Sequence, residues 1–312
     1  MWAERIDEYI NSHECHSHEI VKIYKSGQTS IQSFQIVELG NYGRALVIDG
    51  RIQSTEEDEY IYHESLIYPV YSLHPELKRI LCFGGANGGM LRELRKIPKL
   101  EAVRLIDIDP ELCELSKVHL PHMHQGSYND PRFTVHFGDP RKTMFMLEDK
   151  FDAVFADLPD AVTGTNTSTL FTREFYFHIK HLLNDKGLFV TQAGAAHHRD
   201  CEFFASVLCT LKSVFRFIAP YSVSVPSYGI PWGFVIASDG IDPSIWDETD
   251  ITRKLDALIT NDLRAYDATA HCHMFSLSKT LREALNHSGR IIEDVNPACV
   301  SVNPKGESKI SN

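Results

Sequence analysis

The feature that most constrains the fold is a regular alternation of strand-like and helix-like segments between about residues 75 and 240. Short apolar runs occur at 79–83, 102–109, 133–137, 152–157, 187–194 and 232–238. Amphipathic stretches lie between them at 87–97, 110–120, 172–183 and 201–215. Strands that are apolar on both faces are covered on both sides, and helices connect successive parallel strands. The alternation therefore predicts an α/β fold with a parallel sheet between two layers of helices.

Different patterns flank this region. Three strand-like runs at 19–27, 30–39 and 44–50 are separated by glycines, which is typical of β-hairpins. After residue 244, two more amphipathic helices are expected at 249–266 and 277–285. A small N-terminal β-unit is therefore expected to precede the large sheet.

Composition limits the kinds of partner. With 312 residues, 43% of them hydrophobic, the chain can bury a large core. Its net charge is −11 and it has no basic stripe, so no nucleic-acid partner is expected. No apolar run approaches the roughly 18 residues that span a bilayer, and the N-terminal stretch is too polar for a signal peptide. The seven cysteines are scattered without a C-x-x-C pair. We expect a cytoplasmic protein with reduced cysteines and no membrane partner.

Polar residues stand where five of the predicted strands end. A glycine-rich turn at 84–89 follows the first strand, and further polar groups follow the next four: Asp107, Asp139, Asp157 with Asp160, and Gln192. Ligands of open α/β sheets bind beyond the carboxyl ends of the strands, and an acid about 20 residues after such a turn can bind a ribose. The pattern predicts a nucleoside ligand. The acidic strand ends would repel a dinucleotide and attract a cation, which favours S-adenosylmethionine or its decarboxylated form over NAD.

Several stretches in the same order resemble the polyamine aminopropyltransferases, the spermidine synthase family, over about residues 20 to 300. They include "GNYGRALVIDGRIQSTEEDEYIYHESLIYP", "ILCFGGANGGMLREL", "LIDIDPELCELSKVHLP", "FDAVFADLPDAVTG" and "VPSYGIPWGFVIAS". The loop from Tyr228 to Trp232 and the "ADLPDAVTG" stretch resemble the thermospermine synthase and agmatine-using branch. The resemblance implies an α/β fold: a Rossmann-like class I S-adenosylmethionine-dependent transferase sheet with a small N-terminal β-domain.

The resemblance also implies an activity and a division of the chain. The family transfers an aminopropyl group from decarboxylated S-adenosylmethionine to an amine and releases methylthioadenosine, with no further cofactor and no metal. We expect an N-terminal β-hairpin domain at 1–70, a Rossmann-like catalytic domain at 71–300 and a frayed tail at 301–312. The family further implies a homodimer or homotetramer and a small-molecule amine as acceptor.

The family's site residues carry over to matching positions. Asp157 matches the catalytic base. The expected donor-binding residues are Gln32, His63, Gly84, Gly85, Asn87, Asp107, Ile108 and Asp139. The expected acceptor-binding residues are Tyr62, Asp160, Tyr228 and Trp232. A carboxylate beside the reacting carbon can take the proton of an attacking amine, and aromatic faces suit a cationic, methylene-rich acceptor.

Asn87 departs from the family pattern, which has an aspartate there that binds the amine of the donor. An amide gives up the charge, at a cost of about 1–2 kcal/mol at a half-buried site. The change can be drift at a tolerant position. It can also indicate intact S-adenosylmethionine as donor, because an amide can donate to the carboxylate that the intact donor carries. The transferred group would then be 3-amino-3-carboxypropyl or methyl, and the acceptor an amine or an N-heterocycle.

A third hypothesis is a non-catalytic nucleoside-binding protein. The presence of both Asp157 and Asp160 argues against it, because a binding protein has little need of a base. The stretch "HECHSHE", with His13, Cys15, His16 and His18, has metal-ligand residue types at close spacing. We expect it to precede the folded body and to hold no metal. The sequence does not identify the acceptor.

Overall fold

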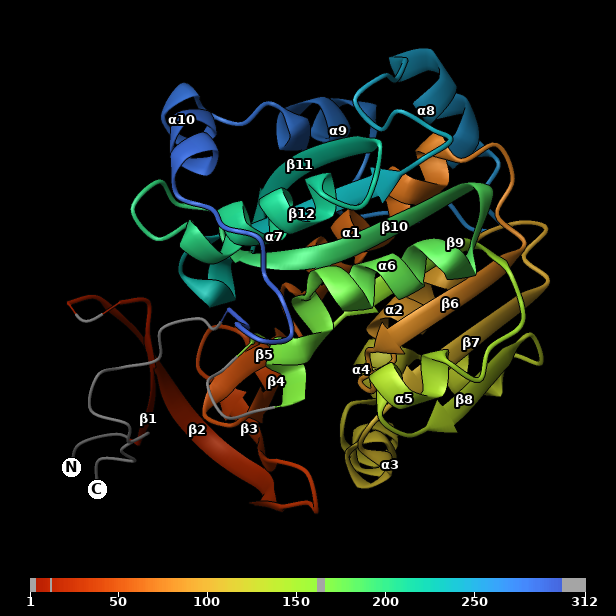
Figure 1. Cartoon of the computed structure of the whole chain (residues 1–312). Helices are drawn as coiled ribbons and strands as arrows, with labels where there is room; N and C mark the ends of the chain where they lie inside the picture. Colours follow the sequence, from red (N-terminus) through yellow and green to blue (C-terminus); the bar gives the residue numbers. More distant parts are fainter. Residues whose placement is uncertain (1–3, 12, 162–165, 299–312) are drawn as a thin grey trace.

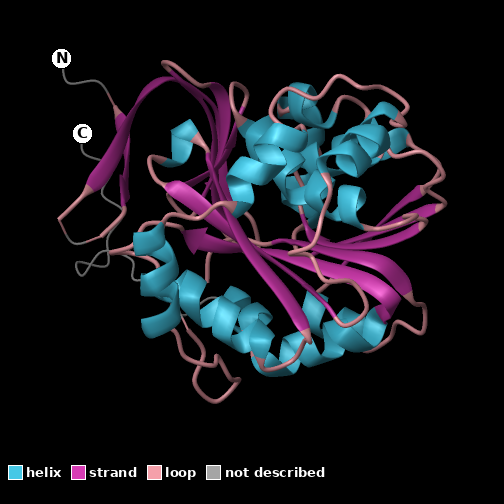
Figure 2. Cartoon of the chain, turned by 90° about the horizontal axis from the view of Figure 1, so that it is seen from above, coloured by secondary structure: helices cyan, strands magenta, loops and turns pink. Residues whose placement is uncertain are grey.

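The computed structural model describes residues 4–11, 13–161 and 166–298, and its strands form two sheets (Figure 1). The smaller sheet lies at the N-terminal end, and the larger one carries helices on both faces (Figure 2). This arrangement confirms the predicted fold class. The frayed tail predicted at 301–312 lies outside the described residues.

The smaller sheet is an antiparallel meander of five strands in chain order. They are β1 (Arg5–Tyr9), β2 (Cys15–Gln28), β3 (Ser33–Leu39), β4 (Gly43–Ile48) and β5 (Arg51–Thr55). Asp49 and Gly50 join β4 to β5 with φ values of 49° and 76°. Two consecutive positive φ angles are typical of the two-residue hairpin turns that match strand twist, and Asp-Gly favours them. The predicted hairpins are confirmed.

The sheet begins earlier than the sequence pattern indicates. Cys15, His16 and His18 lie in β2, and the His18 ring is buried, with its Nε2 atom 3.1 Å from the carbonyl oxygen of Ser227. The expectation that "HECHSHE" precedes the folded body is therefore wrong. β1 pairs with this stretch, from Arg5 opposite Glu19 to Tyr9 opposite Cys15. This pairing makes the segment part of the smaller sheet.

The larger sheet has seven strands in the order β11-β12-β10-β9-β6-β7-β8. They are β6 (Arg79–Gly84), β7 (Ala102–Asp107), β8 (Phe133–Phe137), β9 (Phe151–Asp157), β10 (Leu183–Ala195), β11 (Phe217–Ser224) and β12 (Pro231–Ser238). The first five pair in parallel, as predicted. The last predicted run is antiparallel instead, because β11, which was not predicted, forms a hairpin with β12.

Two layers of helices cover this sheet. One layer contains α1 (Glu59–Leu73), α2 (Gly89–Leu94), α8 (Glu248–Asp256) and α9 (Ala268–Phe275). The other contains α6 (Arg173–Leu182), α7 (Glu202–Lys212) and α10 (Lys279–His287). The short helices α3 (Pro110–His119), α4 (Pro121–His124) and α5 (Pro140–Met144) follow strands β7 and β8. The helix predicted over 249–266 is too long, since α8 ends at Asp256.

Helix α1 was missed because it lacks a polar face. Nearly all of its side chains are buried, including Tyr62, His63 and Glu64. A helix that is buried all round has no amphipathic period to detect. It packs against α2, α8, β9 and β10 and spans the domain boundary predicted at residue 70, which stays a prediction.

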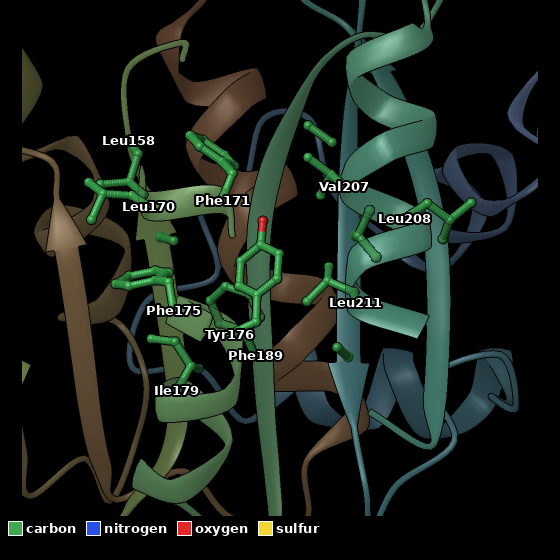
Figure 3. Close-up of a cluster of buried hydrophobic side chains, with 14 of the residues drawn as sticks. Leu158, Leu170, Phe171, Phe175, Tyr176, Ile179, Phe189, Val207, Leu208 and Leu211 are labelled. Carbon is green, nitrogen blue, oxygen red and sulfur yellow. The ribbon is translucent and has the colours of Figure 1, made fainter. Parts of the chain in front are cut away.

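A cluster of buried hydrophobic side chains lies between the larger sheet and the helix layer that contains α6 and α7 (Figure 3). Tyr176 of α6 packs against Phe189 of β10, with ring centroids 5.5 Å apart, and Phe175 of the same helix packs against Phe83 of β6, with ring centroids 5.7 Å apart. Leu158 and Leu170, which flank the loop after β9, belong to the same cluster. Burying each such side chain contributes about 1.5–3 kcal/mol. The packing fixes the base of the loop that carries Asp160.

Candidate active site

A cavity of about 410 Å³ opens where the carboxyl ends of the parallel strands face the smaller sheet. Every residue predicted to bind or react lines it: Gln32, Tyr62, His63, Gly84, Gly85, Asn87, Asp107, Ile108, Asp139, Asp157, Asp160, Tyr228 and Trp232. The fold thus brings together residues that lie as far apart in the sequence as Gln32 and Trp232. Their individual roles stay predictions.

The glycine turn after β6 is required by the packing of the site. Gly84 and Gly85 have φ values of 75° and 93°, which side chains other than glycine rarely adopt. A Cβ atom on Gly84 would lie 2.0 Å from the backbone oxygen of Asp157. A Cβ atom on Gly89 would lie 2.4 Å from the His63 ring. The glycines therefore let the turn contact both Asp157 and His63.

Asn87 has a local structural role in this turn. Its Oδ1 atom accepts a hydrogen bond from the Gly89 amide at 2.9 Å, and its Nδ2 atom donates to Ser54 Oγ at 3.3 Å. Asn87 is 8% exposed. An aspartate could accept the same bond from Gly89, because Asn and Asp both hydrogen-bond the backbone two residues on. An aspartate would differ by losing the donation to Ser54 and by presenting a charge to the cavity.

The end of the cavity that is predicted to bind the donor is built on β7. Asp107 ends this strand and is 7% exposed, and burial raises its pKa to about 6 despite a hydrogen bond from the Asp109 amide. The Asp109 carboxylate accepts a bond from Leu112 and so caps helix α3. Asp109 also accepts from Thr29 at 2.6 Å and from Gln32 at 3.1 Å, which ties the smaller sheet to this end of the cavity.

The Asp107 pKa leads to a pH prediction. A carboxylate accepts hydrogen bonds from both ribose hydroxyls, whereas its protonated form loses part of that capacity. The affinity for methylthioadenosine, which has the ribose but no ammonium, should be constant above about pH 6 and fall as pH drops below it. Calorimetric titration from pH 5 to 8 checks this. Asp107→Asn should bind about 10- to 100-fold more weakly and lose this pH limb.

Asp139 is the N-cap of helix α5 at the same end of the cavity. Its Oδ1 atom accepts from the Arg141 amide at 2.9 Å. Pro140 is the first residue of the helix, a position where the missing N–H has no intrahelical partner anyway. Asp139 therefore faces the cavity from a fixed cap.

Asp157 lies between the glycine turn and helix α1. Its Oδ2 atom is 3.9 Å from His63 Nε2. Burial raises the Asp157 pKa, although His63 and Tyr62 favour the charged form. The His63 Nδ1 atom is 2.6 Å from Glu59 Oε2 and 2.9 Å from the Glu59 carbonyl oxygen. Both are acceptors, so Nδ1 carries a hydrogen. Burial opposes the His63 charge, but the Glu59 bond and the charges of Glu59 and Asp157 raise the pKa of His63, and its Nε2 atom has no hydrogen-bond partner among the described residues.

The other end of the cavity is aromatic. Tyr62 and Tyr228 have ring centroids 6.1 Å apart, and Tyr228 and Trp232 5.0 Å apart. The Tyr228 hydroxyl donates to the Gln53 carbonyl at 2.7 Å, which fixes the ring. Asp160 lies beside this wall and forms an ion pair with Arg51. This end suits a chain of methylene groups with positive charges.

Sequence reasoning missed several charged residues in or beside the cavity, among them Glu8, Arg51 and Glu59. Glu8 and Arg51 line the cavity from β1 and β5, and Glu59 orients His63 from within α1. The sequence pattern did not indicate Glu8 and Arg51, because they lie on the smaller sheet and not at the ends of the predicted parallel strands. The spacing of Glu59 and His63 by four residues would have paired them had α1 been recognised.

Neither a metal-binding cluster nor a membrane-spanning helix is present among the described residues. No group of three or more His, Cys, Asp or Glu residues among them could hold a metal ion. No helix in the described part of the chain is long and apolar enough to cross a membrane.

Comparisons with known proteins agree with one another. The family model for the spermine/spermidine synthase domain matches residues 59–245. The polyamine aminopropyltransferase of Sulfurisphaera tokodaii is 35% identical over 293 residues, which are 94% of this chain and 97% of the relative. Polyamine aminopropyltransferase 2 of Hyperthermus butylicus is 35% identical over 297 residues, 95% of this chain and 97% of that one.

Solved structures show the same similarity. A spermidine synthase in complex with the transition-state analogue AdoDATO superposes with a TM-score of 0.83 at 27% identity, covering 90% of this chain and 94% of that one. Spermidine synthase from Thermotoga maritima superposes with a TM-score of 0.81 at 26% identity, covering 91% and 95%. The likeness thus extends over nearly the whole chain.

Proposed function

The chain belongs to the spermine/spermidine synthase family and is an aminopropyltransferase, and from this premise we propose how its cavity binds and aligns the two substrates. The enzyme moves the aminopropyl group of decarboxylated S-adenosylmethionine to an amine acceptor. The donor's ribose binds Asp107, its adenine lies near Asp139 and Ile108, and its aminopropyl arm extends past Asn87 and His63. The acceptor lies along Tyr62, Tyr228 and Trp232.

Asp157 is the base of the reaction in this proposal. The acceptor's ammonium gives its proton to Asp157, and the freed nitrogen lone pair attacks the methylene carbon bound to the sulfonium. The carbon–sulfur bond breaks and its electron pair stays on sulfur, so the leaving group is the neutral thioether methylthioadenosine. No general acid, metal or redox group is needed because no charged leaving group forms. Alignment of nitrogen, carbon and sulfur supplies much of the rate.

One observation supports this proposal most strongly. Asp157 lines the cavity at the junction between the nucleoside end, through its contact with the glycine turn, and the aromatic end, through Tyr62. A carboxylate at this junction can reach both the reacting carbon and the incoming nitrogen. The acidic lining matches two cationic substrates. The homodimer or homotetramer implied by the family and the cytoplasmic location expected from composition remain proposals.

The test is a transfer assay read by mass spectrometry. Incubating the enzyme with decarboxylated S-adenosylmethionine and a panel of diamines and polyamines should yield methylthioadenosine and an acceptor heavier by one aminopropyl unit. A product carrying a 3-amino-3-carboxypropyl or methyl group from the intact donor would contradict the proposal. Such a product would support the second candidate function, which the neutral Asn87 amide in the cavity favours.

Asn87→Asp separates the two donors directly. The aspartate should keep the bond to the Gly89 amide and add a charge, because Asn87 Oδ1 already accepts there. We expect kcat/KM for decarboxylated donor to rise about 5- to 30-fold and the affinity for intact S-adenosylmethionine to fall. Steady-state kinetics and calorimetry measure the two effects. Equal changes for both donors would show that a charge at position 87 does not select between them.

A further inference from the structure

Two histidines of the stretch "HECHSHE" contact the loop that carries Tyr228. This loop, residues 225–230, joins β11 to β12 and contains a short 3₁₀ turn, η3 (Pro226–Tyr228). His16 and His18 are two residues apart on β2, so their side chains lie on the same face of the strand. Their ring centroids are 4.2 Å apart. The smaller sheet therefore presents a pair of imidazoles to a loop of the larger one.

His18 holds the loop through a buried hydrogen bond. Its Nε2 atom is 3.1 Å from the carbonyl oxygen of Ser227, which is an acceptor, so Nε2 carries a hydrogen and donates it. His18 is 5% exposed and Ser227 is fully buried. The Tyr42 ring packs edge-on against the His18 ring, with centroids 5.3 Å apart. Taking the donor away from so buried a carbonyl favours a loop position in which water reaches it.

Ser227 is also held by a second element. Asp58, the N-cap residue of α1, accepts a hydrogen bond from the Ser227 amide at 2.7 Å and another from the Ser227 hydroxyl at 2.9 Å. Asp58 accepts a third from the Thr55 hydroxyl at 2.7 Å. The amide and hydroxyl of Ser227 thus bind Asp58, and its carbonyl binds His18. The loop keeps the Asp58 anchor when the His18 bond is removed.

His16 supports the loop by packing. Gly229 has a φ of 71°, and a Cβ atom on it would lie 2.4 Å from His16 Nδ1. The backbone at Gly229 therefore lies directly against the imidazole. Tyr228 stands between the two contacts, and its hydroxyl donates to the Gln53 carbonyl at 2.7 Å. The two histidines thus contact the residues directly before and directly after Tyr228.

We propose that His18 is a positioning residue for the acceptor: its hydrogen bond to Ser227 holds the 225–230 loop so that Tyr228 faces the cavity. The inference rests on the proposed function, since it takes the aromatic end as the place of the acceptor. His18 does not line the cavity, so it acts on the acceptor only through Tyr228 and the adjacent Trp232, 5.0 Å away. The residues proposed to bind the donor lie at the other end and should not respond.

Three variants separate the hydrogen bond from the bulk of the side chain. His18→Leu keeps an apolar side chain and removes the donor. His18→Gln keeps an N–H group that can reach the Ser227 carbonyl, because its terminal amide donates from about the place of the imidazole Nε2. His13→Leu makes the same change at an exposed histidine just before β2, and it is the matched control.

The first measurement observes the loop directly, in the free enzyme, by hydrogen exchange and mass spectrometry. The amides of Ser227, Tyr228 and Gly229 are all hydrogen-bonded in the structure, to Asp58, Val225 and Pro226. In His18→Leu, the peptide over 225–232 should exchange at least about 10-fold faster, while the peptide over α7 keeps its wild-type rate. His18→Gln and His13→Leu should match wild type. Unchanged exchange of 225–232 in His18→Leu would overturn the proposal.

The second measurement compares the two ligands by calorimetry. Methylthioadenosine is titrated into each variant, and then spermidine or 1,4-diaminobutane into the methylthioadenosine-saturated enzyme. His18→Leu should bind the amine about 5- to 30-fold more weakly and methylthioadenosine within about 2-fold of wild type. His18→Gln should stay within about 3-fold for both. Equal losses for both ligands would indicate general damage to the fold, and a His18→Gln that behaved like His18→Leu would show that the bond is not what matters. Either result overturns the proposal.

Failure of this proposal and failure of the proposed function are distinguishable. Hydrogen exchange needs no ligand and the titrations need no turnover. Aminopropyl product from wild type, with a loop that exchanges faster in His18→Leu but an unchanged amine affinity, would keep the function and refute the role of His18. Both His18 effects without any aminopropyl product would refute the proposed chemistry and keep His18 as the residue that positions the loop.

Discussion

Replacing Asp157 with Asn is expected to lower kcat about 10²- to 10⁴-fold while changing the KM for the donor little. The amide cannot accept the proton that the acceptor must lose, and general-base catalysis contributes rate factors of this size. Asp157 lies 3.9 Å from His63 Nε2 and against the glycine turn, so an isosteric amide should leave the packing intact. Single-turnover kinetics with saturating substrates measure the chemical step.

The pH profile gives this prediction a second readout. Burial raises the Asp157 pKa, and the base works only when deprotonated, so the wild-type kcat should fall as pH drops through that raised pKa. Asp157→Asn should lose this acidic limb. Asp149→Asn is the matched control, because Asp149 precedes the same strand, lies near the surface and pairs with Arg79 and Arg104. A variant at Asp157 that kept wild-type kcat would remove it as the base.

The residues that the sequence placed in the cavity share a simple physical origin. Asp107, Asp139 and Asp157 each end or follow a parallel strand, and the carboxyl ends of such strands meet at one edge. The positions of the predicted strand ends were therefore enough to place these three residues in one site without a structure. The same rule located the glycine turn, whose packing against Asp157 only the structure could show.

The residues that sequence reasoning missed depend on contacts between distant segments. Glu8 reaches the cavity only because β1 pairs with β2, and Arg51 only because β5 lies beside β4 at the mouth. Helix α1 is almost entirely buried and so carries no periodic signal, and the sequence pattern did not predict β11, which the structure shows in a hairpin with β12. A local sequence pattern predicts where the chain turns. It does not predict which other part of the fold the turn will contact.

Replacing Arg92 with Met should destabilise the fold by about 3–5 kcal/mol at pH 7, because it removes the cation that two buried carboxylates, Glu59 and Glu93, share. Lys96 remains beside Glu93 at 3.0 Å, so most of the loss falls on Glu59. Arg92 is 4% exposed and lies on α2. Its guanidinium donates to Glu59 Oε1 at 2.6 Å, to Glu93 Oε1 at 2.8 Å and to the Met123 carbonyl at 2.8 Å. Urea unfolding measures the change in the free energy of unfolding.

The pH dependence of this loss identifies its cause. Burial opposes the Glu59 charge, but His63 and Arg92 outweigh it and lower the Glu59 pKa to about 2. The stabilisation from this depressed pKa is present above the unfolded value of 4.5 and is lost as pH falls toward 2. The difference between wild type and Arg92→Met should therefore shrink below about pH 4.5. A difference that stayed constant would point to lost packing instead.

Two further variants separate the charge from the side chain. Arg95→Met removes a half-exposed arginine from the end of the same helix, where it donates one bond to the Gln125 carbonyl, and should cost less than about 1 kcal/mol. Arg92→Lys keeps a cation and should recover part of the stability. Because Glu59 holds the Nδ1 hydrogen of His63, both Arg92 variants should also weaken donor binding in proportion to how far Glu59 shifts. A variant that lost stability but kept full donor affinity would show that the orientation of His63 does not depend on Arg92.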